Sequence, residues 1–429
     1  MTTRWVLVAV ALLTFVIQLV SASTGPDKTY SSLNAAQEIA GNLAWKGRYE
    51  GGNWVRLKGV VRPQDPPLRA FNLPGYVWYA AAMWRAFPWA HRYIQIPVVV
   101  TLTVAVAATA ALLGGPTLGL LSGLIAALDP FIVVHGPVWD DAVFGTALLW
   151  VIFAIAIHRW RRDRDTDNTD VWAQDILVGV LAGLAALTRT EAQAIVLALA
   201  VLVWILPALR PLRRTSLLAT AGVVIALTAW GIRNEGAIGA FHTGSTHDGV
   251  TLWESNNAFS RRALAQGQVD HLWLDSSLML PYWSQTAAMT EAGADAYFRH
   301  AAAGYIASHP GDIALTSLDK LAVSLSGVRP EQPLRDSRNV VSVAYDAVLI
   351  LLTAIAVAQL ARAPRLPTRM TLLQVLAIVT IVVIGLLLIG PAGIRYWLTL
   401  RAAMWTLTAV TLLQPRGDAI IRARSDLQR

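Results

Sequence analysis

The chain has 429 residues, of which 55% are hydrophobic and only 14% are charged, and its formal net charge at pH 7 is +8. Soluble proteins average about 25% charged residues, so this composition excludes an ordinary soluble enzyme and indicates a membrane protein. The chain contains no cysteine, which excludes disulfides and thiolate metal sites.

Long apolar runs recur along the chain, and runs of about 18 or more such residues are typical of membrane spans. The length and flanks of the first run, Trp5–Ala22, favour a retained span over a cleaved signal sequence. The later runs are Ile94–Leu113, Leu118–Val134, Ala142–Ile157, Gln193–Leu209, Leu217–Trp230, Ala344–Ala361 and Leu372–Ile389. A short Gly/Ala-rich span at Asp175–Leu187 and a last span that begins at Arg395 bring the prediction to about ten membrane helices.

Basic residues fall on one side of this predicted bundle. The short loops His158–Asp165, Arg210–Arg214 and Arg362–Arg369 are rich in arginine, and such loops stay in the cytoplasm. We therefore expect a multi-pass protein of the inner or plasma membrane with both termini cytoplasmic. Two long segments, Ser23–His91 and Arg233–Arg338, then lie outside.

Both outer segments contain predicted helices. Leu73–Trp89 favours an interfacial helix with Trp78, Trp84 and Trp89 at headgroup level. Asp295–Leu325 favours two helices broken at His309-Pro310. The expected organisation is a catalytic N-terminal bundle, residues 1–232, that includes the loop 23–91, then an external region 233–338, then C-terminal helices and a cytoplasmic tail, 339–429.

Several polar residues fall at one predicted level, the outer membrane surface: Asp27, Asp129, Asp140, Asp141, Arg189, Glu191, Arg395 and Tyr396. Polar groups near a membrane are costly unless they face a cavity. Carboxylates and arginines together suit a site that activates a hydroxyl or amine and holds a phosphate.

Each of these residues also has a structural interpretation. Asp27 alone would be a solvated residue after a span, and Asp140 with Asp141 would cap a helix. Arg189 and Glu191 would form a surface ion pair, and Arg395 would anchor the interface. The histidines have no metal-ligand spacing, and no Walker loop, GxSxG or HExxH motif occurs, so no cofactor is assigned. A divalent metal stays open, although no residue pattern supports it.

The segment AWGIRNEGAIGAFHTGSTHDGVTLWESNN, residues 229–257, resembles a stretch of bacterial membrane glycosyltransferases of the GT-C superfamily, near the protein O-mannosyltransferases and the lipid A aminoarabinose transferase. That stretch has the pattern P-W-x-x-R-N, a glycine, and then S-T-x-x-G-x-N-L-W-x-G-N. Ala229, Thr251 and Ser255 depart from it. The matching positions are Trp230, Arg233, Asn234, Ser245, Thr246, Gly249, Leu252, Trp253 and Asn256.

Other stretches resemble the same family in the same order, so the resemblance covers most of the chain. They are DKTYSSLNAAQEIA, DPPLRAFNLPGYVWYAAAMWRAF, WDDAVF, GLAALTRTEA, YFRHAAAGYIASHPGDIALTSLDK and IRYWLTL. Two departures stand out: Thr190 replaces the proline of T-R-P-E, and the closing R-Y-x-x-P lacks its proline.

The resemblance implies an all-α polytopic membrane protein, a GT-C-like bundle of about ten transmembrane helices with two external loop regions that carry interfacial helices. It implies an inverting hexosyl- or pentosyltransferase that uses a polyprenyl-phosphate sugar and a glycan, lipid or protein acceptor. No nucleic acid is involved.

The resemblance also implies roles for residues. Asp27 would be the general base, and Asp140 or Asp141 would orient the acceptor or assist the base. Arg189 and Arg395, with Tyr396, would bind the donor phosphate. The candidates for acceptor or substrate contacts are Tyr30, Arg69, Tyr76 and Glu191, with Arg69 standing where relatives have a lysine.

Two other classes of protein stay open. A lipid-linked substrate transporter or flippase predicts polar residues at the bilayer midplane and inverted repeats, whereas the span middles here are Ala, Leu, Val and Ile. A non-catalytic protein that keeps the GT-C fold is not excluded by the sequence, although the candidate acidic residues are present.

Overall fold

The computed structural model describes residues 2–24, 35–51, 67–161, 169–265, 285–286, 289–326, 337–362, 367–390 and 397–413. Within these ranges the chain is helical, and the only β contact is an isolated antiparallel bridge between Gly51 and Leu68. The predicted all-α fold is confirmed.

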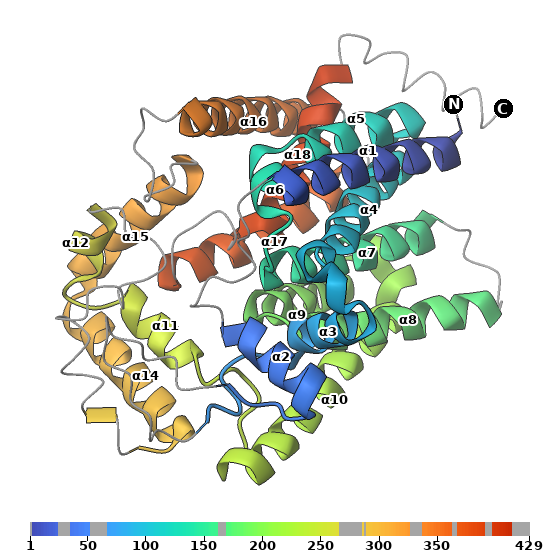
Figure 1. The fold of residues 1–429 in the computed structure, drawn as a ribbon. Coiled ribbons are helices and arrows are strands. Elements are labelled where there is room, and N and C mark those ends of the chain that lie inside the picture. Colours follow the sequence, from blue (N-terminus) through green and yellow to red (C-terminus); the bar gives the residue numbers. More distant parts are fainter. Residues whose placement is uncertain are drawn as a thin grey trace.

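In the described part of the chain, ten apolar helices form the bundle, which Figure 1 shows. Five contain stretches long and apolar enough to cross a membrane: α1 (Thr3–Thr24), α4 (Ile96–Gly114), α7 (Asp141–Arg161), α10 (Arg213–Ile238) and α16 (Ser337–Arg362). Five contain shorter apolar stretches: α5 (Pro116–Ala127), α8 (Thr169–Ala186), α9 (Thr190–Ile205), α17 (Pro367–Ile389) and α18 (Leu398–Leu413). They correspond to the apolar runs of the sequence, and the chain is a multi-pass membrane protein.

Small residues let these helices approach closely, as is usual inside membranes. A Cβ atom added to Gly222 on α10 would lie 1.9 Å from the carbonyl oxygen of Gly179 on α8. A Cβ added to Gly119 on α5 would lie 2.7 Å from the carbonyl oxygen of Ala107 on α4. The glycines of these runs therefore set the contact distance between neighbouring helices.

Two expected spans have different bounds in the structure. The run Leu118–Val134 is not one helix, because α5 ends at Ala127 and the short α6 (Pro130–His135) follows. Asp129 between them has extended backbone angles, as a residue before proline prefers, and caps α6 by accepting from the Phe131 amide at 2.8 Å. The span Leu217–Trp230 is longer than expected, since α10 continues to Ile238 and ends at Gly239 with φ 73°.

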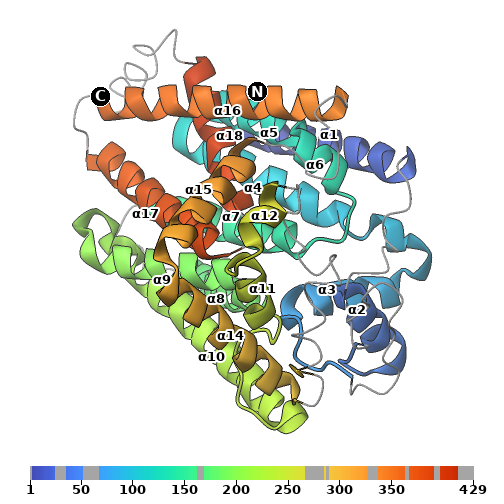
Figure 2. The ribbon, with the colours of Figure 1, turned by 90° about the vertical axis from the view of Figure 1, so that its left-hand side faces the viewer.

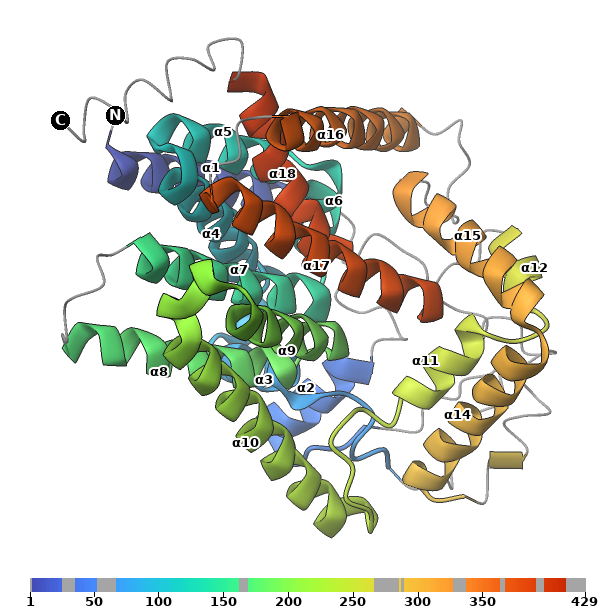
Figure 3. The same cartoon turned by 180° about the vertical axis from the view of Figure 1, so that it is seen from behind.

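Two connecting regions gather at one end of the bundle, which we call the loop end (Figures 1 and 3). The first contains α2 (Ala35–Lys46), α3 (Pro74–Ala86) and η1 (Pro88–Tyr93), and the second contains α11 (Asp248–Ser255), α12 (Ser260–Ala265), α14 (Glu291–Ser308) and α15 (Pro310–Ser326). Seen from the loop end, α11, α12, α14 and α15 lie in front of the bundle (Figure 2). The predicted helix within Leu73–Trp89 and the predicted break at His309-Pro310 are confirmed.

A sealed ion cluster ties the bundle together. Arg401 on α18 donates to Asp129 through Nε at 2.8 Å and Nη2 at 3.1 Å, and its Nη2 lies 2.5 Å from Asp346 on α16. Trp405 donates its indole N–H to Asp129 at 2.8 Å. The three charged side chains are at most 1% exposed. Asp129 was expected in the outer polar layer, but it is enclosed by the bundle and joins α18 to the α5–α6 break.

Candidate functional site

Arg189, at the turn between α8 and α9, is the centre of the candidate site. It is the N-cap residue of α9 and has extended backbone angles. Its Nη1 donates to Asp141 at 3.0 Å, while its Nη2 and Nε donate to the two carboxylate oxygens of Glu191 at 2.6 and 3.0 Å. The Arg189 side chain is 11% exposed, whereas Asp141 is 38% and Glu191 is 21% exposed. One guanidinium thus holds two carboxylates, and Asp141 is the more accessible of the two.

A glycine of α3 makes room for this turn. Gly75, near the start of α3, donates its amide to the carbonyl oxygen of Leu187 at 2.7 Å. A Cβ on Gly75 would lie 2.4 Å from the Thr188 hydroxyl oxygen, so no larger residue fits there without movement. Gly145 on α7 lies beside the Arg189 side chain, where an added Cβ would be in ordinary contact with its Cδ at 3.5 Å. The stretches P-G-Y, W-D-D-A-V-F-G and L-T-R-T-E therefore meet around Arg189.

Asp140 and Asp141 have different surroundings. Asp140 accepts from the Ala142 amide at 2.7 Å through Oδ1, which is the bond of a helix cap at the start of α7. Its backbone carbonyl accepts from Gln95 Nε2 at 3.0 Å, and Gln95 Oε1 accepts from the Tyr76 hydroxyl at 2.9 Å. Tyr76 is only 2% exposed. Asp141 is thus the residue of the pair that contacts Arg189, and the Tyr76 hydroxyl supports the start of α7 through Gln95.

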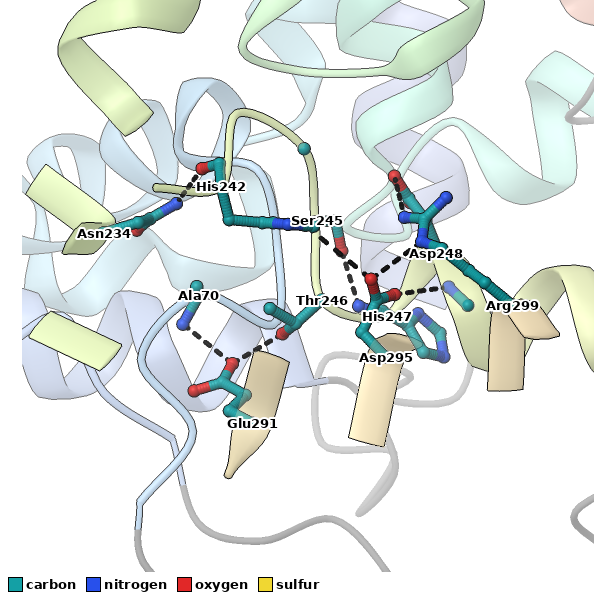
Figure 4. A network of polar contacts seen from close by, with 12 residues as sticks. Ala70, Asn234, His242, Ser245, Thr246, His247, Asp248, Glu291, Asp295 and Arg299 are labelled. Atoms are coloured by element: carbon teal, nitrogen blue, oxygen red, sulfur yellow. Dashed lines mark hydrogen bonds and ion pairs between the residues drawn. The ribbon is translucent and has the colours of Figure 1, made fainter. Parts of the chain in front are cut away.

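Arg69 belongs to a second cluster, the inter-loop network of Arg69, Ala70, Ser245, Thr246 and Glu291. Figure 4 shows Ala70, Ser245, Thr246 and Glu291 of this network. The Glu291 carboxylate accepts from the amides of Arg69 and Ala70 at 2.8 and 2.9 Å and from the Thr246 hydroxyl at 2.6 Å. The Thr246 amide donates to the Ala70 carbonyl at 3.0 Å, and the Ser245 hydroxyl donates to the carbonyl of Phe71. These bonds join the first connecting region to the second.

The segment 229–257, which carries the family resemblance, makes structural contacts at the end of α10. Arg233 lies over the rings of Tyr49 and Trp230, 4.9 and 4.8 Å from their centroids, and donates to the carbonyls of Arg69 and Tyr49. Asn234 donates to the His242 carbonyl at 2.6 Å. The end of α10 is thereby attached to the first connecting region, and the S-T pair continues the attachment.

Asp248, which the sequence analysis did not single out, stands between this network and the Arg189 cluster. Burial, opposed by Arg299 and reinforced by Asp295 and Glu191, raises the pKa of Asp248 to about 6. Arg299 lies 3.7 Å from Asp248 and donates to Asp295 at 2.7 Å, and Asp295 accepts from the Gly249 amide at 2.7 Å. The effect of Glu191 on Asp248 places the start of α11 within electrostatic range of the start of α9. The sequence feature that points to Asp248 is the Asp-Gly pair that opens a helix after the S-T pair.

Four predicted site residues, Asp27, Tyr30, Arg395 and Tyr396, lie outside the described residues, so their roles stay predictions. The described part brings Asp141, Arg189 and Glu191 into one cluster and assigns Asp140, Tyr76 and Arg69 to supporting contacts. Within that part, no group of three His, Asp or Glu side chains lies close enough together to hold a metal ion.

Solved structures with a similar fold come from an archaeal oligosaccharyltransferase. AglB of Archaeoglobus fulgidus, in complex with an inhibitory peptide and a dolichol-phosphate, matches 99% of this chain and 52% of its own, with 13% identity and a TM-score of 0.58. The same enzyme tethered to an acceptor peptide matches 96% of this chain and 49% of its own, with 12% identity and a TM-score of 0.56. This likeness confirms the expected GT-C-like fold.

The chain spans about half the length of these oligosaccharyltransferase structures. ArnT of Cupriavidus metallidurans, bound to undecaprenyl phosphate, is 16% identical over 96% of this chain and 78% of its own, at a TM-score of 0.41. No protein-family model matches the sequence, and no curated protein matches it.

Proposed function

We propose that the chain is a membrane glycosyltransferase that transfers a sugar from a polyprenyl-phosphate donor to an acceptor on the extracytoplasmic face. The observation that carries this proposal is the meeting of three separate stretches around Arg189 at the loop end of a GT-C-like bundle. An AglB structure of the same fold contains a dolichol-phosphate and a peptide, which supports a lipid-linked donor and a second, acceptor substrate.

In the proposed reaction Asp27 takes the proton of the acceptor hydroxyl or amine. The acceptor atom forms a bond to the anomeric carbon, and the bond from that carbon to the phosphate oxygen breaks. The electron pair leaves with the polyprenyl phosphate, and the single displacement inverts the anomeric centre. A positioned general base contributes about 10²- to 10⁴-fold to such a rate.

Arg189 is the proposed ligand of the donor phosphate, together with Arg395 and Tyr396. Two bonds to Glu191 fix the plane of its guanidinium, whereas the bond to Asp141 is made through Nη1. A phosphate oxygen that replaces Asp141 on Nη1 would form a charge-assisted hydrogen bond of the kind arginine favours. Asp141, once released, would turn to the acceptor.

Of the other predicted residues, some are proposed to contact the acceptor directly and others to position the residues that do. Tyr30, three positions after Asp27 in the sequence, is the proposed direct acceptor contact. Arg69, which is 47% exposed, is proposed to meet the acceptor from the inter-loop network. Glu191 acts on Arg189, and Tyr76 and Asp140 act on Asp141 by fixing the start of α7.

The test is transfer of labelled sugar from polyprenyl-phosphate pentoses and hexoses in liposomes that also contain an extract of cell-envelope acceptors. Asp27→Asn keeps the size of the side chain but removes its basicity, so transfer falls about 10²- to 10⁴-fold while polyprenyl-phosphate binding is retained. Glu235→Gln, an exposed carboxylate of α10, is the matched control and leaves transfer unchanged.

Near-normal transfer in Asp27→Asn would contradict the assignment of the base and move that role to Asp140 or Asp141. Absence of transfer by the wild-type protein with every donor, in liposomes in which a known enzyme of this type is active, would contradict the proposed function itself.

A further inference from the structure

Helix α15 is amphipathic, but it exposes apolar residues and buries polar ones, whereas a surface helix of a soluble protein does the opposite. Its apolar residues Leu315 and Leu318 are 44% and 61% exposed. On the other side a polar stripe with helical spacing is buried, at 8% exposure or less: Thr316, Ser317, Lys320 and Ser324. A helix that turns leucines outward and an ammonium inward is suited to apolar surroundings, with its polar face on a binding site.

Lys320 is the unusual member of this stripe because its ammonium makes few contacts with the described residues. It is 2% exposed and donates one long hydrogen bond, 3.4 Å, to the carbonyl of Leu388 on α17, which also accepts from Ser317 at 2.9 Å. No ion pair of Lys320 with a carboxylate occurs in the described part of the chain. The adjacent Asp319 is paired with Arg261 at 3.1 Å, and Asp346 on the neighbouring α16 is paired with Arg401.

A buried ammonium without a counter-ion is unfavourable, and the usual response is a lower pKa. Burial lowers the pKa of Lys320 to about 7. An anion bound beside it would restore the charged form and remove the desolvation penalty. The structure thus holds a cationic group that gains free energy from an anionic ligand.

The choice of lysine at this position is itself informative. Only four of the 35 basic residues are lysines, namely Lys28, Lys46, Lys58 and Lys320. Arginine stays charged in proteins, whereas a buried lysine can lose its proton while its site is empty. A lysine is therefore suited to a buried site that binds and releases an anion during turnover.

The position of α15 indicates what kind of anion reaches it. The helix packs against α16 and α17 at the loop end, as Figure 3 also shows. Those two helices expose apolar side chains, including Val341 at 59% and Ile381 at 65%, and the exposed leucines of α15 extend this apolar surface. Helix α17 also packs along α9, which begins at the Arg189 cluster. The buried face of α15 thus adjoins an apolar surface, and α17 connects it to the helix that begins at the candidate site.

We propose that the buried face of α15 binds the phosphate of a polyprenyl phosphate, with Lys320 as its cationic ligand and the isoprenoid chain in the surrounding lipid. The nature of the lipid rests on the proposed function. Ser317 is placed to donate to the same phosphate in exchange for the Leu388 carbonyl. Lys320 is then a binding residue for the donor that adds to Arg189.

Two variants test the proposal by direct binding of polyprenyl phosphate in nanodiscs. Lys320→Met keeps the length of the side chain without its charge, and we expect the dissociation constant to rise about 10- to 100-fold. Lys320→Arg restores a cation and brings the affinity back toward that of the wild type. Lys46→Met, which changes an exposed lysine at the end of α2, is the control and leaves the affinity unchanged. Equal affinity in Lys320→Met, checked as folded by thermal unfolding, would overturn the proposal.

A second measurement observes the amine itself. Reductive methylation with ¹³C labels only four lysines and the N-terminus, and Lys320→Arg assigns the Lys320 signal. Addition of polyprenyl phosphate should raise the pKa of this signal by about 1 to 3 pH units. An equal response to inorganic phosphate or to phosphatidic acid vesicles would overturn the assignment of the lipid, and no response to polyprenyl phosphate would overturn the site.

These results separate the inference from the proposed function. A response of Lys320 to polyprenyl phosphate without any sugar transfer leaves the lipid site standing and contradicts the transferase. Sugar transfer by the wild type without a response of Lys320 supports the transferase and contradicts the lipid site.

Discussion

Two arginines, Arg401 and Arg189, each hold two carboxylates, yet they stand in opposite surroundings. Arg401 with Asp129 and Asp346 is sealed between α18, α16 and the α5–α6 break, with side chains at most 1% exposed. Arg189 with Asp141 and Glu191 lies at the loop end, and its carboxylates are 38% and 21% exposed. The same three charges thus occur once inside the bundle and once at its end.

The difference shows that burial, not composition, separates a structural cluster from a candidate site. A sealed cluster cannot exchange its partners, because each charge would be left uncompensated in surroundings of low dielectric constant. In the proposed function, the cluster at the loop end releases Asp141 to solvent at small cost and accepts a phosphate in its place. Arg401 therefore stabilises the packing of α18, whereas Arg189 is the arginine proposed to bind a substrate.

Loss of the Arg401 charge should have the largest effect. Arg401→Met fills the same space but leaves Asp129 and Asp346 uncompensated, and breaking such a buried cluster costs about 3–5 kcal/mol. We expect thermal unfolding in detergent at a much lower temperature, or loss of the folded protein. Arg189→Met, which removes a charge from the more exposed cluster, is the matched comparison and should lower the unfolding temperature much less. Equal losses in the two variants would show that the clusters do not differ in kind.

Loss of the Arg189 charge should act on turnover instead. Arg189→Gln keeps polar contacts with Asp141 and Glu191 but cannot neutralise a leaving phosphate, and loss of one such electrostatic group costs about 10²- to 10³-fold in rate. Arg189→Lys keeps the charge but not the two parallel bonds to Glu191, so an intermediate rate is expected. The measurement is kcat/KM for sugar transfer, with the unfolding temperature as the control. A wild-type rate in Arg189→Gln would contradict the assignment of Arg189 to the site.

The sequence predicts the bundle well because membrane helices occur in it as apolar runs. The residues at which each helix begins and ends, however, depend on local contacts. The run Leu118–Val134 hides a break, since Asp129 and Pro130 end one helix and start another. The continuation of α10 to Ile238 was equally hidden, because polar Arg233 and Asn234 suggest a loop. In the structure the Arg233 side chain binds the first connecting region, and Asn234 donates to the His242 carbonyl just after α10.

The site is predictable in part. Arg189, Glu191 and Asp141 were expected at one level, and they touch. The sequence could not distinguish the roles of Asp140 and Asp141. Consecutive residues at a helix start point in different directions, and only the neighbouring helix determines which of the two side chains meets Arg189. The sequence also gave no reason to pair Asp129 with Arg401, which lies 272 positions away.

The inter-loop network should give a smaller, local effect. Glu291→Ala leaves the amides of Arg69 and Ala70 without their carboxylate acceptor. Ala70 is buried, and an unsatisfied buried donor costs about 1–3 kcal/mol, whereas the exposed Arg69 amide can bind water instead. Hydrogen exchange of those two amides should become faster, while amides of α4 in the bundle stay protected. Glu291→Gln, which keeps one acceptor oxygen, should fall between the two. Unchanged exchange at both amides in Glu291→Ala would mean that other contacts hold the connecting regions together.

The smallest expected effect is a pH dependence at Asp248, the residue between the two polar clusters of the loop end. Burial raises its pKa to about 6 in the folded protein, so its contribution to stability is present below the pKa of the unfolded chain and is lost as the pH rises through about 6. Asp248→Asn does not titrate, so the unfolding temperature of the variant should gain on that of the wild type between pH 4 and 7. The groups that face Asp248, namely Arg299, Asp295 and Glu191, and His242 beside Asp295, are the same in both proteins, so their own titration largely cancels in the difference. The gain should be small, because Asp248 is 33% exposed and Arg299 favours its charged form. A difference that stays constant from pH 4 to 7 would show that Asp248 titrates as an ordinary surface carboxylate.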